Sequence, residues 1–287
     1  MAAMTTPPDR SPPNCRICGG TTTAAGRDAL ECQQCESVIV RVVPTADELT
    51  AFYAKYNDSY SGGGGSGGRN QIRYAEAYLR LVRRFTTGGS ILDVGCANNP
   101  FVNLATRGGF RASAADFTRP SHLSPEVTFR FGHLNDDSWV TDEDTYDSVT
   151  AWAVIEHVRD PALAFQTLGA LTKPGGRVFM TTPEAGTTLT RWAAGGTPWF
   201  YPPEHLHLLS PGAVERLADP HGLELTKWGH FELTPLRWLA RYGIGVFETA
   251  SGALLRGLSP ARWRERRRTR RQRFVGIAYY VLRKRGG

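Results

Sequence analysis

Long apolar runs are missing from this chain of 287 residues, and no uncharged stretch approaches the ~20 residues that a membrane-spanning helix needs. The opening stretch, MAAMTTPPDRSPPN, also lacks the apolar core of a secretory signal peptide. These two absences predict a cytoplasmic protein. Thiols stay reduced in that compartment, so the five cysteines point to metal binding or chemistry before disulfides.

Acidic residues are scarce in the C-terminal part of the chain. From residue 256 onward, twelve Arg and Lys side chains stand against a single acid, Glu265, a local charge of +11 in a chain whose net charge is +7. The remainder is mildly acidic, which argues against an enzyme that grips nucleic acid with its whole face. Three interpretations of the basic segment stay open: peripheral contact with an anionic membrane, an RNA-binding tail, and a solvated helix that covers the domain. In the first, the buried side chains would be Trp238, Leu239, Phe247 and Leu254.

Five parts are predicted along the chain. Residues 1–13 are rich in Pro and Thr and are expected to form a disordered tail. Residues 14–43 contain four cysteines and short β-prone pieces, and residues 44–70 combine a lid helix with the flexible stretch SGGGGSGG. Residues 71–234 alternate strands with helices, which is the pattern of a doubly wound α/β sheet. Residues 235–287 are expected to form a basic helical insertion and a last strand.

Local signals set the expected bounds of these elements. Thr45 or Asp47 can cap the lid helix, and the next helix is expected to begin at Gln71 and to stop before Gly88 and Gly89. β-prone pieces near the cysteines are ALECQQC and SVIVRVV. The strand candidates of the main domain are SILDVG, RASAADF, VTFRFG, YDSVTAWAV, GRVFMTT, LELTKWG and FVGIAYYVLRK.

Two Cys-x2-Cys pairs, Cys15 with Cys18 and Cys32 with Cys35, are separated by thirteen residues. Each pair can present two thiolates to one ion, and four thiolates complete the tetrahedral shell of a structural Zn²⁺. The spacing therefore predicts a small zinc ribbon. Two disulfides or redox pairs are the alternative, which fits a cytoplasmic chain poorly. With no open coordination position, the metal is expected to be structural and to have no part in turnover.

A strand candidate, a tight turn and a helix follow one another in ILDVGCANNP, residues 91–100. Such a turn lets backbone N–H groups and a helix N-terminus approach a ligand closely. Asp116 closes the next strand candidate, and an acid at this place accepts hydrogen bonds from ribose hydroxyls. Because dinucleotide-binding folds use the same acid, Asp116 alone does not separate a nicotinamide cofactor from S-adenosylmethionine (SAM).

The downstream residues make that distinction. Between Tyr146 and Glu184, the order and spacing of YDSV, AVIEHV, DP, LTKPGG and MTTPE resemble the signature of class I SAM-dependent methyltransferases. ILDVGCANNP resembles the first motif of this superfamily, with Ala97 and Asn99 where glycines are usual. PTADELTAFYAKYNDSY, after the cysteines, resembles a methyltransferase-23-like bacterial subgroup that carries N-terminal zinc-ribbon knuckles. The resemblance extends from residue 15 to about 230, and it implies a doubly wound, seven-stranded Rossmann-like sheet.

The resemblance also implies where the cofactor binds. In this family the methionine part of SAM lies over the turn after the first strand, and the acid after the second strand holds the ribose. The residues expected to contact SAM are Asp93, Gly95, Cys96, Asn98, Asp116, Phe117, Leu134, Ala151 and Trp152.

Two histidines are expected at the carboxyl edge of the sheet, where ligands bind in open α/β folds. An imidazole with a near-neutral pKa suits the removal of a proton from a hydroxyl acceptor. His157 is the first candidate for this general base and His205 the second; the alternative for each is a structural histidine bound to a backbone carbonyl. Glu156 is expected to brace His157 or to cap the next helix. A catalytic metal is disfavoured, because quinone O-methyltransferases that bind one with such a Glu-His pair have a further Glu where this chain has Ala153.

The combined prediction is a SAM-dependent methyltransferase that O-methylates a small or lipid-linked hydroxyl acceptor, such as a sugar or a polyketide. Its cofactors would be SAM and structural zinc, and its partners the acceptor and, through the basic segment, a membrane surface. Nucleic acid is less favoured, although methylation of an rRNA base stays an alternative because one bacterial family pairs a zinc knuckle with this fold. SAM binding without catalysis is a second alternative, which Ala97 and Asn99 allow.

Overall fold

The computed structural model describes residues 14–25, 28–49, 51–52, 67–141, 143–185, 200, 202–230 and 277–286. The predicted disordered tail, most of the Gly-rich stretch and the arginine-rich part of the basic segment lie outside these residues. Within the described part of the chain, no helix has the length and the apolar character that crossing a membrane requires.

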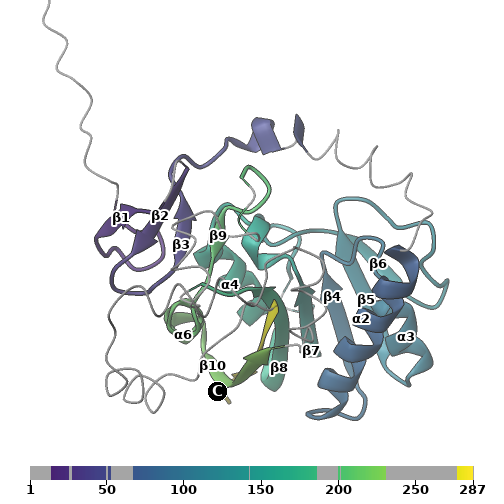
Figure 1. Cartoon of the computed structure of the whole chain (residues 1–287). Coiled ribbons are helices and arrows are strands. Elements are labelled where there is room, and N and C mark those ends of the chain that lie inside the picture. Colours follow the sequence, from purple (N-terminus) through teal and green to yellow (C-terminus); the bar gives the residue numbers. More distant parts are fainter. Residues whose placement is uncertain are drawn as a thin grey trace, which may run out of the picture.

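Seven strands form the central sheet, in the order β10-β11-β8-β7-β4-β5-β6 (Figure 1). Neighbouring strands are parallel from β6 to β8, whereas β11 runs antiparallel to both β8 and β10. The predicted doubly wound sheet is confirmed, and each of the seven strand candidates forms one of its strands. Their bounds are β4 Ser90–Val94, β5 Arg111–Asp116, β6 Thr128–Phe131, β7 Tyr146–Trp152, β8 Thr172–Pro183, β10 Leu223–His230 and β11 Ile277–Lys284.

The strand order reverses at β4, which has β5 on one side and β7 on the other. Ile91, Leu92 and Val94 of β4 are almost completely buried, as expected for a parallel strand that is covered on both faces. In open α/β sheets, ligands bind beyond the carboxyl ends of the strands at such a reversal. The ends of β4, β5 and β7 are therefore the expected position of a ligand site in this fold.

Helices cover both faces of the sheet (Figure 1). On one face, Tyr78 and Phe101 pack in a core with Phe179 of the sheet; on the other, Phe165 and Val214 pack in a second core. Proline stands at the first position of two of these helices, where it costs no hydrogen bond. The helices are α2 Gly67–Arg83, α3 Phe101–Arg107, α4 Pro161–Ala170 and α6 Pro211–Ala218, with the short 3-10 turns η1 Ile155–His157 and η2 Asp219–His221.

One helix begins earlier than the sequence predicts, whereas the lid helix has Thr45, one of its two predicted caps, at its start. α2 begins at Gly67 and not at Gln71, because the N–H groups of a first turn make no intrahelical bond and glycine costs little there. The lid helix begins after Thr45, whose hydroxyl accepts a hydrogen bond from the Glu48 amide while the Glu48 carboxylate accepts one from the Thr45 amide. This reciprocal pair is a capping box.

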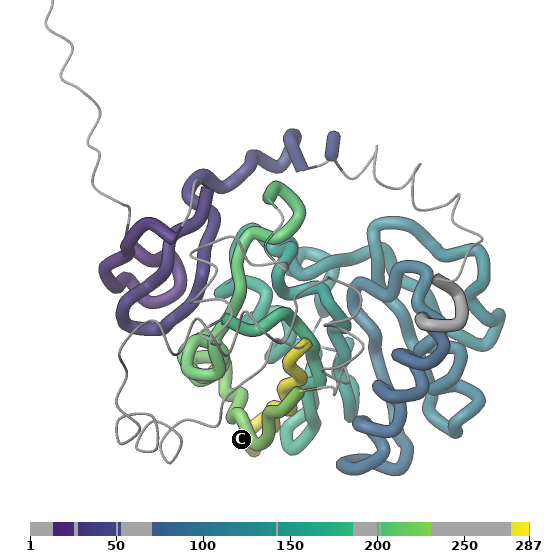
Figure 2. Tube along the Cα trace, in the orientation of Figure 1, coloured from purple at the N-terminus to yellow at the C-terminus, as the bar shows by residue number. Residues whose placement is uncertain are grey.

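A second sheet has the order β1-β2-β3-β9 and joins the cysteine-containing segment to the main domain. Its strands are β1 Thr22–Ala24, β2 Ala29–Cys32, β3 Val38–Val40 and β9 His207–Leu208. The tube view shows this N-terminal segment, in purple, beside the green segment that contains β9 (Figure 2). The two β-prone pieces near the cysteines do form strands, whereas β9 was not predicted because two residues carry no periodic signal.

Candidate active site and four-cysteine site

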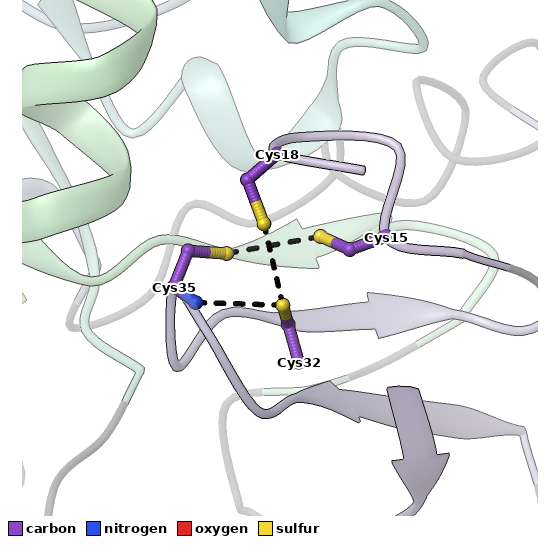
Figure 3. Close-up of side chains that lie close together, drawn as sticks. All are labelled: Cys15, Cys18, Cys32 and Cys35. Atoms are coloured by element: carbon purple, nitrogen blue, oxygen red, sulfur yellow. Dashed lines mark hydrogen bonds between the residues drawn. The ribbon is translucent and has the colours of Figure 1, made fainter. Parts of the chain in front are cut away.

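The four cysteines converge from two turns, and Figure 3 shows their sulfur atoms facing one another. All four sulfurs lie within 4.8 Å of one another, with Cys15 Sγ 3.7 Å from Cys35 Sγ and Cys18 Sγ 3.4 Å from Cys32 Sγ. A tetrahedral ion with Zn–S bonds of ~2.3 Å holds its sulfurs ~3.8 Å apart, so these distances suit one such ion. The thiols are free and not joined in disulfides. The cluster can therefore form a zinc site.

The turn after β4 has the conformation that close approach of a ligand needs. Gly95 has a φ of +75°, and a Cβ at this position would lie 2.5 Å from Cγ2 of Val154, so no other residue fits without a shift. Ala97 adopts a φ of +40°, which a small side chain tolerates better than a β-branched one. Asn99 Oδ1 accepts a hydrogen bond from the Phe101 amide at the start of α3. Both departures from the usual glycines are thus compatible with the turn.

Two buried polar atoms at the ends of neighbouring strands have no hydrogen-bond partner among the described residues. One is Oδ2 of Asp93 in β4, whose Oδ1 accepts a hydrogen bond from the Thr150 hydroxyl; the other is Nε1 of Trp152 in β7. Burial raises the pKa of Asp93 to about 8. A buried polar atom without a partner costs ~1–3 kcal/mol. A ligand with a cationic group here would restore the charged form of Asp93.

The end of β5 lies beside this turn. Asp116 Oδ2 accepts a hydrogen bond of 2.8 Å from the Ala97 amide, and Oδ1 accepts one of 2.7 Å from the Phe117 amide. Each oxygen keeps a further lone pair for a ligand hydroxyl. Phe117 is 64% exposed as a residue, and its ring stacks on His133 with ring centroids 4.1 Å apart. These two rings present a flat surface next to the carboxylate.

The structure brings the nine predicted cofactor residues to one edge of the sheet. They lie at the ends of β4, β5 and β7 and in the loop after β6. Asn98 is exposed there, whereas the side chains of Cys96, Leu134 and Ala151 are buried. Their predicted contacts with SAM stay predictions.

His157 and His205 lie edge to face with ring centroids 4.9 Å apart. His157 Nδ1 donates a hydrogen bond of 3.0 Å to the Glu204 carbonyl, which leaves Nε2 with a lone pair. Burial, with a smaller effect of His205, lowers the pKa of His157 to about 4. This value lies below the near-neutral pKa expected from the sequence, which does not show that the half-buried ring lies beside His205. At neutral pH His157 is in its basic form.

Glu156 is buried in η1, and its Oε1 lies 4.0 Å from His157 Nε2. Burial raises the pKa of Glu156 to about 8. It does not cap the next helix, because Asp160 accepts the first-turn amide hydrogen bonds of α4. Together with His205, the Glu156–His157 pair offers potential ligand atoms within 4.8 Å of one another, so a third such group is present although Ala153 offers none. The prediction against a catalytic metal remains untested.

Sequence reasoning missed a further pair at the same edge. The Glu184 side chain, at the end of β8, is completely buried and pairs with Nε2 of His230 at the end of β10. The only available signal was the position of Glu184 directly after a predicted strand. Its partner lies 46 residues away, and no local pattern connects the two.

Comparison with known proteins assigns the family. A methyltransferase-domain family model matches residues 68–227, which is more than half of the chain. The chain belongs to this family. It is a SAM-dependent methyltransferase, and the resemblance to the class I superfamily is confirmed.

The relatives are distant. The ubiquinone biosynthesis O-methyltransferase of Aeromonas salmonicida is 26% identical over 168 residues, covering 52% of this chain and 68% of that protein. The protein of the same name from Alkalilimnicola ehrlichii is 31% identical over 149 residues, with 49% of this chain and 58% of that protein covered. A Burkholderia thailandensis N1-methyltransferase crystallised with 1,6-didemethyltoxoflavin and S-adenosylhomocysteine has a TM-score of 0.50 at 12% identity, with 92% of this chain and 99% of that chain covered. This last likeness shows a shared fold.

Proposed function

We propose that this methyltransferase transfers the methyl group of SAM to a hydroxyl oxygen of a small or lipid-linked acceptor. The observation that carries the proposal is the fixed tautomer of His157. Its Nδ1 proton is held by the Glu204 carbonyl, so Nε2 is the atom that can accept a proton. Two relatives named as O-methyltransferases support transfer to oxygen.

The residues of the cofactor edge fit SAM, which when bound supplies an electrophilic methyl group on a sulfonium. The unpartnered Oδ2 of Asp93 would accept a hydrogen bond from the amino group of the methionine part. Asp116 would accept hydrogen bonds from the ribose hydroxyls, and the Phe117–His133 surface would lie against the adenine. The glycine at position 95 lets the backbone come close to the ligand.

His157 would take the acceptor proton in this reaction. A hydroxyl oxygen becomes strongly acidic as its new bond to carbon forms, so even a base with a pKa of about 4 can accept the proton at that stage. The products are the methyl ether, S-adenosylhomocysteine and the proton on Nε2. Glu156 would steady the imidazole from 4.0 Å away, and His205 would orient the acceptor.

A labelled-methyl assay tests this function. The purified full chain is incubated with methyl-labelled SAM and separate panels of catechols, prenylated phenols, sugar nucleotides and rRNA, and the methylated product is identified by mass spectrometry. We expect an O-methyl product from a small or prenylated hydroxyl compound. Label on nitrogen, carbon or rRNA would overturn the proposal, and tight SAM binding with no transfer to a whole-cell extract would favour a SAM-binding protein.

We further propose that the four-cysteine site holds structural zinc and that the basic segment brings the enzyme to anionic membranes. Four converging thiols support the first idea. The second rests on the arginine-rich sequence between residues 256 and 273. Flotation with vesicles of anionic lipid, compared with zwitterionic vesicles, tests it: equal flotation on both would argue against electrostatic attachment.

A further inference from the structure

The cysteine-containing segment is connected to the active site through the backbone of Leu206. The Leu206 amide donates a hydrogen bond of 2.8 Å to the Glu156 carbonyl in η1. Its carbonyl accepts a hydrogen bond of 2.9 Å from the Val40 amide of β3 and a second one from Nη2 of Arg16. One peptide therefore joins the cysteine-containing segment to the turn that carries Glu156 and His157.

His207 makes a parallel connection through its side chain. Its Nε2 lies 2.7 Å from the Ile155 carbonyl, which can only accept, so Nε2 carries the proton. Nδ1 is then an acceptor, and it lies 3.3 Å from Nη2 of Arg16. The ring is completely buried between η1 and the first cysteine turn. Two separate contacts thus lead from Arg16 to η1.

Arg16 stands inside the first Cys-x2-Cys pair, between Cys15 and Cys18. Its Nε and Nη1 are buried and have no hydrogen-bond partner among the described residues. A buried cation with unpaired donors is costly unless an opposite charge lies nearby. Asp160 is one such charge, since its carboxylate favours the charged guanidinium, and four thiolates around one Zn²⁺, with a net charge of about −2, would add to it. An occupied metal site and a buried Arg16 therefore support each other.

The segment that Arg16 contacts also contains His205 and the carbonyl group that fixes the tautomer of His157. His205 directly precedes Leu206, and the Glu204 carbonyl accepts the Nδ1 proton of His157. A shift of residues 204–207 would break the bond that fixes the His157 tautomer. The residues around Asp93 and Asp116 make no contact of this kind with Arg16, Leu206 or His207 among the described residues.

We propose that Arg16 is a positioning residue that couples the metal site to catalysis: it holds residues 204–207 against η1 and so sets the orientation of His157. This inference rests on the proposed zinc site and on His157 as the base. It departs from the expectation that the zinc has no part in turnover. Loss of Arg16 should lower turnover and leave SAM affinity unchanged, because the proposed cofactor residues are not part of the contacts between Arg16, residues 204–207 and η1.

The test uses the zinc-loaded full chain and the variants Arg16→Gln and Arg16→Lys. Arg41→Gln is the matched control, because Arg41 is an exposed arginine of the same segment. Zinc content is measured by mass spectrometry, SAM affinity by calorimetry and the His157 tautomer by nitrogen-15 NMR of the imidazole, assigned with a His157→Gln spectrum. The NMR readout needs no acceptor, so it can fail or succeed independently of the proposed O-methylation.

For Arg16→Gln with zinc still bound, we expect SAM affinity within about twofold of the parent, a mixture of His157 tautomers and turnover lower by about tenfold to a hundredfold. Arg16→Lys keeps the charge and can reach one acceptor, so it should recover part of the tautomer signal and of the turnover. An unchanged His157 spectrum in both Arg16 variants would overturn the proposal. So would a fall in SAM affinity that parallels turnover, or the same changes in Arg41→Gln. If Arg16→Gln does not fold, Arg16→Lys alone decides between these outcomes.

Discussion

Replacing Asp116 with asparagine tests the cofactor site directly. The carboxylate accepts amide hydrogen bonds from Ala97 and Phe117, which hold the turn after β4 against the end of β5. Its remaining lone pairs are the proposed acceptors for two ribose hydroxyls. Asparagine keeps one acceptor oxygen and places an amide NH2 where the second oxygen was.

The expected loss of SAM affinity follows from the removal of one hydrogen bond to a charged carboxylate. Such a bond contributes ~1.5–3 kcal/mol, and each ~1.4 kcal/mol is a factor of ten in affinity. We therefore expect Asp116→Asn to raise the Kd for SAM, and that for S-adenosylhomocysteine, by about 10- to 100-fold in calorimetric titrations. An unchanged Kd for both ligands would remove Asp116 from the site and refute the reasoning.

Asp147→Asn is the matched control. The Asp147 carboxylate also ties two strands together, because it accepts hydrogen bonds from the Ser90 amide at 2.7 Å, the Ser90 hydroxyl at 2.8 Å and Lys173 Nζ at 3.0 Å. It does so at the opposite edge of the sheet, at the start of β7. This variant should lower the free energy of unfolding and leave SAM affinity unchanged. Equal losses of affinity in the two variants would mean that Asp116 acts through folding alone.

The stability difference between the parent and the Asp147→Asn control should depend on pH. Partial burial raises the pKa of Asp147, but the hydrogen bonds from Ser90 and from Lys173 outweigh this and lower it to about 2. A depressed carboxylate pKa contributes stability above the unfolded value of ~3.9, and that contribution is lost as the pH falls toward 2. Urea unfolding should therefore show a large difference between parent and Asp147→Asn at pH 5 and a smaller one at pH 3. A difference that is constant over this range would contradict the assignment.

Three further predictions concern the metal, the base and the turn. Metal analysis should find one zinc, and chelation should lower the melting temperature; a zinc-free protein with unchanged stability would exclude the site. His157→Gln should lower turnover by about 10²- to 10⁴-fold and leave SAM affinity unchanged. Near-normal turnover in this variant would mean that His157 is not the general base and would make His205 the candidate. Gly95→Ala should lower the free energy of unfolding by more than ~1 kcal/mol, and by more than Gly175→Ala does. The angle φ is positive at both positions, but only a Cβ at position 95 would clash with Val154. Equal losses in urea unfolding would contradict this.

Much of the fold could be predicted because its signals are local. The run Ile91–Val94 is apolar enough for a strand covered on both faces, and the Asp160–Pro161 pair marks the start of α4. The cysteine spacing predicted the convergence that the structure shows. The cofactor edge follows from the same logic, since each strand and the turn after it are continuous in the sequence. Predicting these elements requires no information about contacts between residues distant in the sequence.

The parts that could not be predicted depend on contacts between distant residues. The His157 imidazole has a low pKa because of its burial in the fold and, to a smaller extent, because His205 lies beside it, and no local sequence pattern indicates either contact. Glu184 and His230 meet only because β8 and β10 end at the same edge. β9 exists because β3 lies beside it, and two residues cannot form a strand without a partner.

The pairing of β9 with β3 also affects how the edge that carries His157 is held in place. The turn after β4 is held by Asp116 at the end of a neighbouring strand, and η1 follows β7 directly, so both depend on the main sheet. Residues 204–207 have only a two-residue strand and no long partner in that sheet. They bond to η1 on one side and to β3 and Arg16 of the small cysteine-containing module on the other. A zinc ion at the four-cysteine site would stabilise such a module, so under the proposed coupling its removal is expected to disturb the His157 tautomer.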